Sequence, residues 1–212
     1  MVDLNEIREN LIQGKAARVK ELVQKAIDEG QDVEKVLSEG LISGMDIVGK
    51  KFKKNEFYIP EMLIAARAMK RGMEVLRPIL IKKDIKSAGI VVLGTARGDL
   101  HDIGKNLVGM MMEGAGFEIV DLGVDVSPEK FVEAAKEKGA NIIGVSALLT
   151  TTMPGMKDVV QVLKESGLKE EIKVMVGGAP VTQSYADEIG ADGYAPDAAS
   201  AADKAKQLLE IA

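Results

Sequence analysis

The chemistry of this chain centres on its single histidine, His101, because the 212 residues contain no cysteine. His101 stands in a polar loop, Gly98-Asp99-Leu100-His101-Asp102-Ile103-Gly104, which follows a run with buried-strand character at 89–93. A histidine two residues after a carboxylate has the spacing of a metal-ligating imidazole whose second ring N–H is held by an acceptor. Taken alone, a loop histidine is more commonly a surface or locally hydrogen-bonded residue, so its surroundings decide whether metal binding is the better interpretation.

A metal at His101 would have to bring most of its own ligands. Zinc and the other transition metals usually take three or four protein ligands, and one imidazole without any thiolate cannot supply such a set. A metal held in a macrocycle, which means haem or a corrin, needs only an axial ligand from the protein. The Cys-x-x-Cys-His signature of covalently attached haem is absent. A corrin and a haem with one axial histidine therefore both remain open.

Composition restricts the class of protein and its partners. With 46% hydrophobic and 29% charged residues, the chain is expected to form one or two globular domains. No apolar run reaches membrane-spanning length and residues 1–6 lack signal-peptide character, so we expect a cytoplasmic protein without a membrane partner. A net charge of -5 with only three Tyr, four Phe and no Trp argues against nucleic acid as a partner.

A polar segment at 82–88 separates two hydrophobic patterns, and it predicts two domains, 1–85 and 86–212. In the first domain apolar residues recur at helical spacing over 4–12 and 19–26. Asp32 is suited to cap a third helix that runs toward Lys53, and Pro60 is suited to the first turn of a fourth. These segments predict an all-α four-helix bundle.

In the second domain, short β-branched runs alternate with helical patterns. Strands are predicted at 90–93, 117–122, 142–146, 173–176 and 193–195, and helices at 103–113, 128–138, 153–165, 181–189 and 198–209. Parallel strands need crossover helices, so the alternation predicts an α/β fold with a doubly wound five-stranded parallel sheet, Rossmann- or flavodoxin-like.

Ligands bind such sheets outside the carboxyl ends of the strands, and the least usual residues of the chain follow predicted strands. These are the histidine loop, the hydroxyl-rich Ser146–Thr152, the segment Gly177-Gly178-Ala179-Pro180, and Pro196–Ala199. Paired glycines let a ligand approach the backbone, but they also suit a tight turn. Asp197, similarly, is suited simply to cap the last helix.

Three motifs in this order, Asp99-x-His101-x-x-Gly104, Ser146-x-Leu148 and Gly177-Gly178, resemble the signature of cobalamin-binding domains. Together with the bundle, the whole chain resembles the methyltransferase-cognate corrinoid proteins of methylotrophic methanogens and acetogens. It is also similar to the helical-cap and cobalamin-binding domains of cobalamin-dependent methionine synthase. The resemblance implies a cobalamin or related corrinoid, with His101 as the metal ligand.

The resemblance further implies a base-off, His-on cofactor, in which His101 replaces the cofactor's benzimidazole below cobalt. Asp99 would accept the distal imidazole N–H, and Ser146 would extend that hydrogen-bond chain. The cofactor-binding residues implied in this way are Gly98, Asp99, Leu100, His101, Asp102, Ile103, Gly104, Ser146, Leu148, Thr150, Gly177, Gly178, Ala179 and Ala198.

The benzimidazole tail would, by the same resemblance, enter a slot along the sheet. Gly177 and Gly178 would leave room for it, while Ser146, Leu148 and Thr150 would line its path. Ala198 would flank its far end.

In function, the resemblance implies a methyl carrier that is not catalytic alone. It would take a methyl group from a substrate-specific methyltransferase and pass it to a second methyltransferase acting on a pterin or thiol, with a reductive activase as a further partner. The bundle would cover the methyl-bearing face of the corrin and would have to move. The donor would be selected by the partner rather than by this chain.

Other function classes share part of this pattern. The cobalamin-binding subunit of adenosylcobalamin-dependent isomerases and aminomutases shares the histidine motif. A cobalamin sensor is a further alternative, but it would need an output domain, and no effector module is visible in the sequence. A flavodoxin-like signalling domain would account for the sheet but not for the three motifs.

Overall fold

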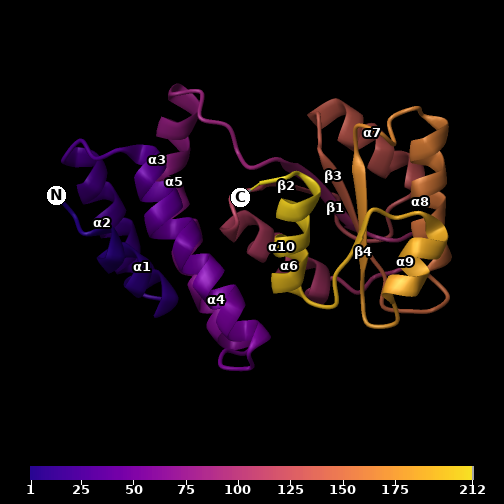
Figure 1. Cartoon of the computed structure of the whole chain (residues 1–212), viewed down its shortest axis with the longest axis horizontal. Helices are drawn as coiled ribbons and strands as arrows, with labels where there is room; N and C mark the ends of the chain where they lie inside the picture. The colour runs from indigo at the N-terminus through magenta and orange to yellow at the C-terminus, as the bar shows by residue number, and fades with distance from the viewer. Residues whose placement is uncertain (212) are drawn as a thin grey trace. The chain divides into compact units, whose positions relative to one another are not determined.

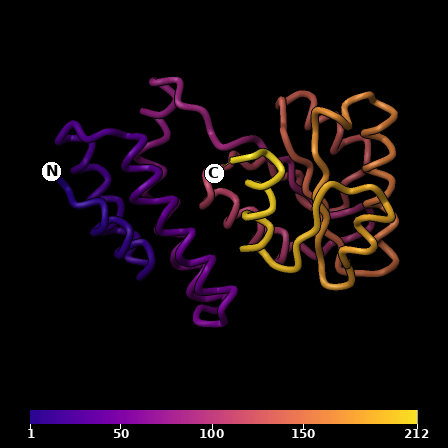
Figure 2. The backbone as a smooth tube through the Cα atoms, viewed as in Figure 1, coloured from indigo at the N-terminus to yellow at the C-terminus, as the bar shows by residue number. Residues whose placement is uncertain are grey.

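A computed structural model describes residues 1–211, and the chain divides into two compact units. The first consists mainly of Met1–Lys86 and the second mainly of the residues from Ser87 onwards. Figure 2 traces the backbone through both, with the first unit in indigo and purple and the second in pink to yellow. Each unit is described by itself.

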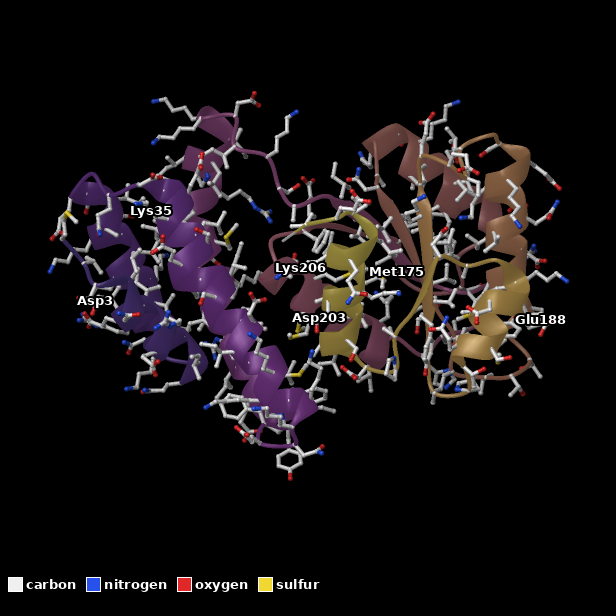
Figure 3. All side chains as sticks on the ribbon, viewed as in Figure 1. Asp3, Lys35, Met175, Glu188, Asp203 and Lys206 are labelled. Carbon is white, nitrogen blue, oxygen red and sulfur yellow. The ribbon has the colours of Figure 1, made fainter. Side chains whose placement is uncertain are left out.

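The first unit is helical. Its elements are α1 (Leu4–Ile12), α2 (Ala16–Asp28), α3 (Val33–Lys35), η1 (Val36–Ile42), α4 (Ser43–Lys53) and α5 (Ile59–Lys82). Local signals set the helix starts: the Asp3 carboxylate, labelled in Figure 3, accepts from the backbone N–H of Asn5, and Asp32 caps α3 in the same way. Pro60 lies in the first turn of α5, as its sequence position predicted.

The helix expected between Asp32 and Lys53 is not regular, because η1 is a π-helix. Gly40 of η1 and Gly44 of α4 face α1. A Cβ atom on Gly40 would lie 3.3 Å from Ile7, and one on Gly44 would lie 3.0 Å from Leu11. Small residues at these positions let the two helices pack closely. Apolar periodicity does not reveal a π-turn, because it records the buried face and not the number of residues in each turn.

The second unit is a doubly wound α/β fold (Figure 1). Its elements are β1 (Ile90–Thr95), α6 (Ile103–Gly114), β2 (Glu118–Asp121), α7 (Pro128–Lys138), β3 (Ile142–Ser146), α8 (Pro154–Glu165), β4 (Lys173–Gly177), α9 (Gln183–Ile189), β5 (Gly193–Tyr194) and α10 (Ala198–Leu208). Within residues 1–211 the sheet has five strands in the order β2-β1-β3-β4-β5, and every pairing is parallel. Helices α7, α8 and α9 cover one face and α6 and α10 the other (Figure 1).

Both faces of the sheet are buried, as parallel strands covered by crossover helices require. Val92, Ile143 and Val174 pack with Phe131 of α7 in the main apolar cluster. The alternate residues of the same strands point to the opposite face and are buried as well, among them Met175 of β4, labelled in Figure 3. The charged Glu188 of α9 is exposed (Figure 3), whereas Lys105 of α6 is buried and forms an ion pair with Asp121.

The direction of the crossovers reverses between β1 and β3, which lie side by side in the sheet. Their register pairs Thr95 with Ser146, so both strands end at the same level. Ser146 is in turn paired with Gly177 of β4. The loops after β1 and β3 diverge to opposite faces, and such a switch point is where open α/β sheets bind ligands. Among the helices of residues 1–211, none is long and apolar enough to cross a membrane.

Candidate functional site

In the structure the histidine loop consists of residues 96–102, because Ile103 and Gly104 already belong to α6, and it leaves the sheet at this switch point. The Asp99 carboxylate is fully buried, whereas the side chain of His101 is 48% exposed. Oδ1 of Asp99 lies 3.0 Å from Nδ1 of His101 and also accepts the backbone N–H of His101 at 3.0 Å. One carboxylate oxygen therefore holds both the main chain and the ring of the histidine.

The other oxygen of Asp99 binds the loop after β3. Oδ2 accepts the hydroxyl of Thr152 at 2.6 Å and the backbone N–H of Leu148 at 2.8 Å, with a longer contact of 3.4 Å to the N–H of Leu149. Asp99 therefore connects the two loops that diverge at the switch point.

These hydrogen bonds keep the Asp99 carboxylate ionised. Burial by itself raises the pKa of Asp99, but the hydrogen bonds from Thr152, from the His101 backbone and from the Leu148 backbone outweigh it, so the pKa lies well below its ordinary value. An ionised carboxylate can only accept, so the proton of a neutral imidazole must be on Nδ1. The lone pair of Nε2 is then available to a metal.

The surroundings of His101 fit a flat macrocycle. This loop offers one imidazole nitrogen, and a corrin supplies the remaining metal ligands itself. The two loops and the first residue of α6 carry large apolar side chains that are exposed: Leu100, Ile103, Leu148 and Leu149. Exposed apolar groups around a polar centre are typical of ligand sites. Nothing lies within 4 Å of the position that a Cβ atom on Gly104 would take, so the start of α6 is also open.

In the structure, the hydroxyl that donates to Asp99 belongs to Thr152. The resemblance had implied that Ser146 would extend the hydrogen-bond chain from Asp99. Ser146 pairs within the sheet through its backbone, and its hydroxyl makes no hydrogen bond to Asp99 among residues 1–211. Thr152 is buried, and its hydroxyl also lies 2.9 Å from the carbonyl oxygen of Leu149. The run Thr150-Thr151-Thr152 signalled a hydroxyl here, but spacing alone could not identify which one turns inward.

Gly178 leaves room for the protein's own backbone. It has a φ of +133°, and a Cβ atom there would lie 1.9 Å from the carbonyl oxygen of Ala147. At Gly177 a Cβ atom would lie 3.1 Å from the carbonyl oxygen of Ala195. The paired glycines thus allow the exits of β3, β4 and β5 to pack closely.

The remaining expected residues lie along the same edge of the sheet. Leu148, Thr150 and Ala179 are exposed, and Ala198 is buried as the first residue of α10. Asp197 caps that helix by accepting from the backbone and hydroxyl of Ser200. In the described part of the chain, no hydrogen bond joins Thr150, Ala179 or Ala198 to the histidine loop. The geometry thus brings together the loops after β1 and β3, while Ala198 stands two strands further along.

Comparisons with known proteins agree with this geometry. A family model described as a B12 binding domain matches residues 89–203, and a second with the same description matches residues 3–77. A corrinoid protein of Desulfitobacterium hafniense is 46% identical over 97% of both chains. The chain belongs to the corrinoid protein family. The family and the cobalamin-type cofactor that the motifs predicted are confirmed.

Two further matches describe this corrinoid protein's relatives. Dimethylamine corrinoid protein 1 of Methanosarcina acetivorans is 45% identical, over 95% of this chain and 99% of that one. A chain in the crystal structure of the methanol:cobalamin methyltransferase complex MtaBC from Methanosarcina barkeri has a TM-score of 0.83 at 32% identity, covering 96% of this chain and 78% of that one. The predicted fold class, a helical region followed by a five-stranded parallel sheet, is confirmed.

Proposed function

We propose that this corrinoid protein binds cobalamin base-off and His-on, and that it carries a methyl group between two methyltransferases. The observation that carries the proposal is the Asp99–His101 pair. The buried carboxylate of Asp99 is hydrogen-bonded to Nδ1 of His101. The imidazole ring is nearly half exposed where the loops after β1 and β3 diverge. A bound anion on one ring nitrogen orients a ligating imidazole and raises the basicity of the other nitrogen.

When bound, the corrinoid supplies the cobalt that accepts and releases the methyl group. The residues of this chain would hold and orient the cofactor: His101 would be its ligand from the protein, Asp99 is the hydrogen-bond acceptor of His101, and Thr152 is one of the donors that keep Asp99 ionised. No side chain of the chain needs to act as a general acid or base on the methyl group.

The relatives indicate which partner enzyme to test first. Because a relative named for dimethylamine is 45% identical and the MtaBC chain is 32% identical, a methylamine-specific methyltransferase is the first donor enzyme to test. The acceptor enzyme would act on a pterin or a thiol, and a reductive activase would restore the carrier after accidental oxidation of cobalt. Transfer of methyl groups from dimethylamine, monomethylamine and methanol, each with its own methyltransferase, would identify the donor.

Titration of the cofactor-free protein with hydroxocobalamin and methylcobalamin, followed by ultraviolet–visible spectroscopy, tests the binding mode. We expect tight binding with the spectrum of a displaced benzimidazole. His101→Ala should lose the imidazole-ligated spectrum, and added imidazole should restore it. Binding of a cobinamide, which lacks the benzimidazole, should give the same ligated spectrum with the wild-type protein.

A label on the histidine nitrogen makes this test decisive, because the chain has one histidine. Electron paramagnetic resonance of the cob(II)alamin-loaded protein should show hyperfine splitting from that labelled nitrogen. Splitting from the cofactor's own benzimidazole would instead contradict His-on binding.

A further inference from the structure

The main chain of Asp99 has hydrogen-bond partners that are distinct from those of its carboxylate. Thr95, the last residue of β1, donates its hydroxyl to the carbonyl oxygen of Asp99 at 2.5 Å. The backbone N–H of Asp125, in the loop after β2, points at the same carbonyl at 3.0 Å and at the Thr95 hydroxyl oxygen at 2.9 Å. Thr95 is completely buried, so its hydroxyl serves this contact and not the solvent.

Asp125 also binds the histidine loop through a hydrogen bond to its side chain. Its Oδ1 accepts the backbone N–H of Gly98 at 2.6 Å. The residue has a φ of +53°, in the left-handed region of backbone conformation, which residues other than Gly, Asn and Asp rarely adopt. Its carboxylate is exposed, so burial does not account for the conformation. Strained backbone of this kind persists where surrounding contacts hold it.

Asp99 is consequently fixed on two sides by two different loops. The loop after β3 binds its carboxylate through Leu148 and Thr152. The end of β1 and the loop after β2 bind its main chain through Thr95 and Asp125. A carboxylate that must meet both the backbone and the ring of His101 tolerates little displacement, because hydrogen bonds weaken steeply when they bend. Binding constellations of this type need supporting residues to hold their geometry.

We propose that Thr95 and Asp125 are positioning residues, which set the backbone of the histidine loop so that Asp99 and His101 are aligned before the corrinoid arrives. This proposal rests on the proposed His-on function for its consequence in binding, but the alignment itself exists without cofactor. The two can therefore be tested separately.

The first experiment observes His101 in the cofactor-free full chain. Nitrogen–proton correlation spectra of the imidazole give one set of signals, because the chain has a single histidine. In the wild type we expect the Nδ1-protonated, hydrogen-bonded form. Thr95→Val should shift the Nδ1 signal toward that of a free imidazole, and Thr95→Ser should restore it. Far-ultraviolet circular dichroism and urea unfolding identify any variant that fails to fold.

Three substitutions at Asp125 separate hydrogen bonding from backbone strain. Asp125→Asn keeps an acceptor and tolerates the left-handed backbone, so it should behave as the wild type. Asp125→Gly relieves the backbone and removes the acceptor, and Asp125→Ala removes the acceptor while keeping the strain; both should shift the Nδ1 signal. Asp84→Ala is the matched control, because Asp84 is also an aspartate with positive φ, at +54°, and lies outside this network.

The second experiment measures the dissociation constant for hydroxocobalamin. For Thr95→Val, Asp125→Gly and Asp125→Ala we expect about fivefold weaker binding, the change that one lost hydrogen bond of about 1 kcal/mol makes in an equilibrium constant. Thr95→Ser and Asp125→Asn should bind within about twofold of the wild type, which is small beside one such hydrogen bond.

The outcomes distinguish the two proposals. Unchanged imidazole signals and affinity in folded Thr95→Val and Asp125→Gly would overturn the positioning role, as would a loss in Asp125→Asn as large as that in Asp125→Gly. Wild-type binding without imidazole ligation would overturn His-on binding alone, since the cofactor-free spectra would still decide the roles of Thr95 and Asp125.

Discussion

At the scale of single residues, the site depends on one buried carboxylate. Asp99 accepts hydrogen bonds from the main chain and ring of His101, from the backbone of Leu148 and from the Thr152 hydroxyl. The folded protein therefore stabilises a charge that would otherwise be unfavourable in its interior. Removing one donor leaves part of that buried charge unsatisfied, so the contribution of each donor can be measured as a change in stability.

Thr152→Val tests the shortest of these contacts by replacing a hydroxyl with a methyl group of similar size. We expect a loss of about 1.5–3 kcal/mol in the free energy of unfolding, the usual range for a hydrogen bond to a charged group. Urea unfolding of the cofactor-free protein measures it. Ser146→Ala is the control, with an expected change below about 0.5 kcal/mol because its hydroxyl does not bind Asp99. A larger loss for Ser146→Ala than for Thr152→Val would reverse the assignment.

At the scale of elements, the site depends on how closely three strand exits approach one another. The N–H of Ala147 donates to the carbonyl of Gly177 at 3.1 Å, and Gly178 packs directly against the Ala147 carbonyl. The loop that begins at Ala147 also supplies the donors of Leu148 and Thr152 to Asp99. Strand packing at Gly178 thus sets the position of a loop that reaches the histidine.

Gly178→Ala should disturb this packing, because its Cβ atom would lie 1.9 Å from a backbone oxygen that cannot rotate away. We expect a loss of at least about 3 kcal/mol of stability, beyond the range of an ordinary surface substitution. Gly167→Ala is a matched control, since Gly167 also has positive φ, at +76°, but nothing lies within 4 Å of its Cβ position. The control should lose only about 1–2 kcal/mol, which reflects backbone conformation alone. Equal losses in thermal or urea unfolding would refute the steric explanation.

At the scale of the whole molecule, the chain consists of two units that meet in sequence at 86–87. The segment around this point is polar, and Lys82, Lys83 and Lys86 are exposed. Domain boundaries usually lie in such exposed, polar stretches, where few contacts cross.

Limited digestion with trypsin should therefore cleave first at Lys82, Lys83 or Lys86 and release two resistant fragments. Mass spectrometry of the early products identifies the bonds. Replacing all three lysines with glutamine should slow this cleavage selectively. Earlier cleavage in α5 before Lys82, or within the sheet unit, would show that the boundary is not the most accessible part of the chain.

Several features could be predicted from the sequence because they depend on local pattern. The alternation of β-branched runs with helical segments indicated the parallel sheet. Because the chain has one histidine and no cysteine, a metal bound at His101 was expected to be held in a macrocycle. The order of the three motifs indicated the corrinoid family. The carboxyl ends of parallel strands share one edge, so even the common location of the loops followed from the pattern.

Other features depend on contacts between residues far apart in the chain, and only the tertiary structure decided them. The choice of Thr152 over Ser146 on Asp99, and the role of Gly178 against Ala147, follow from how neighbouring strands end and turn. The contacts of Thr95 and Asp125 with the histidine loop arise in the same way. Three consecutive threonines have the same chemistry in sequence, and only the folded loop turns one of them toward a buried charge. The sequence by itself thus determined which chemistry the chain offers, whereas the packing of distant loops determined which residues align it.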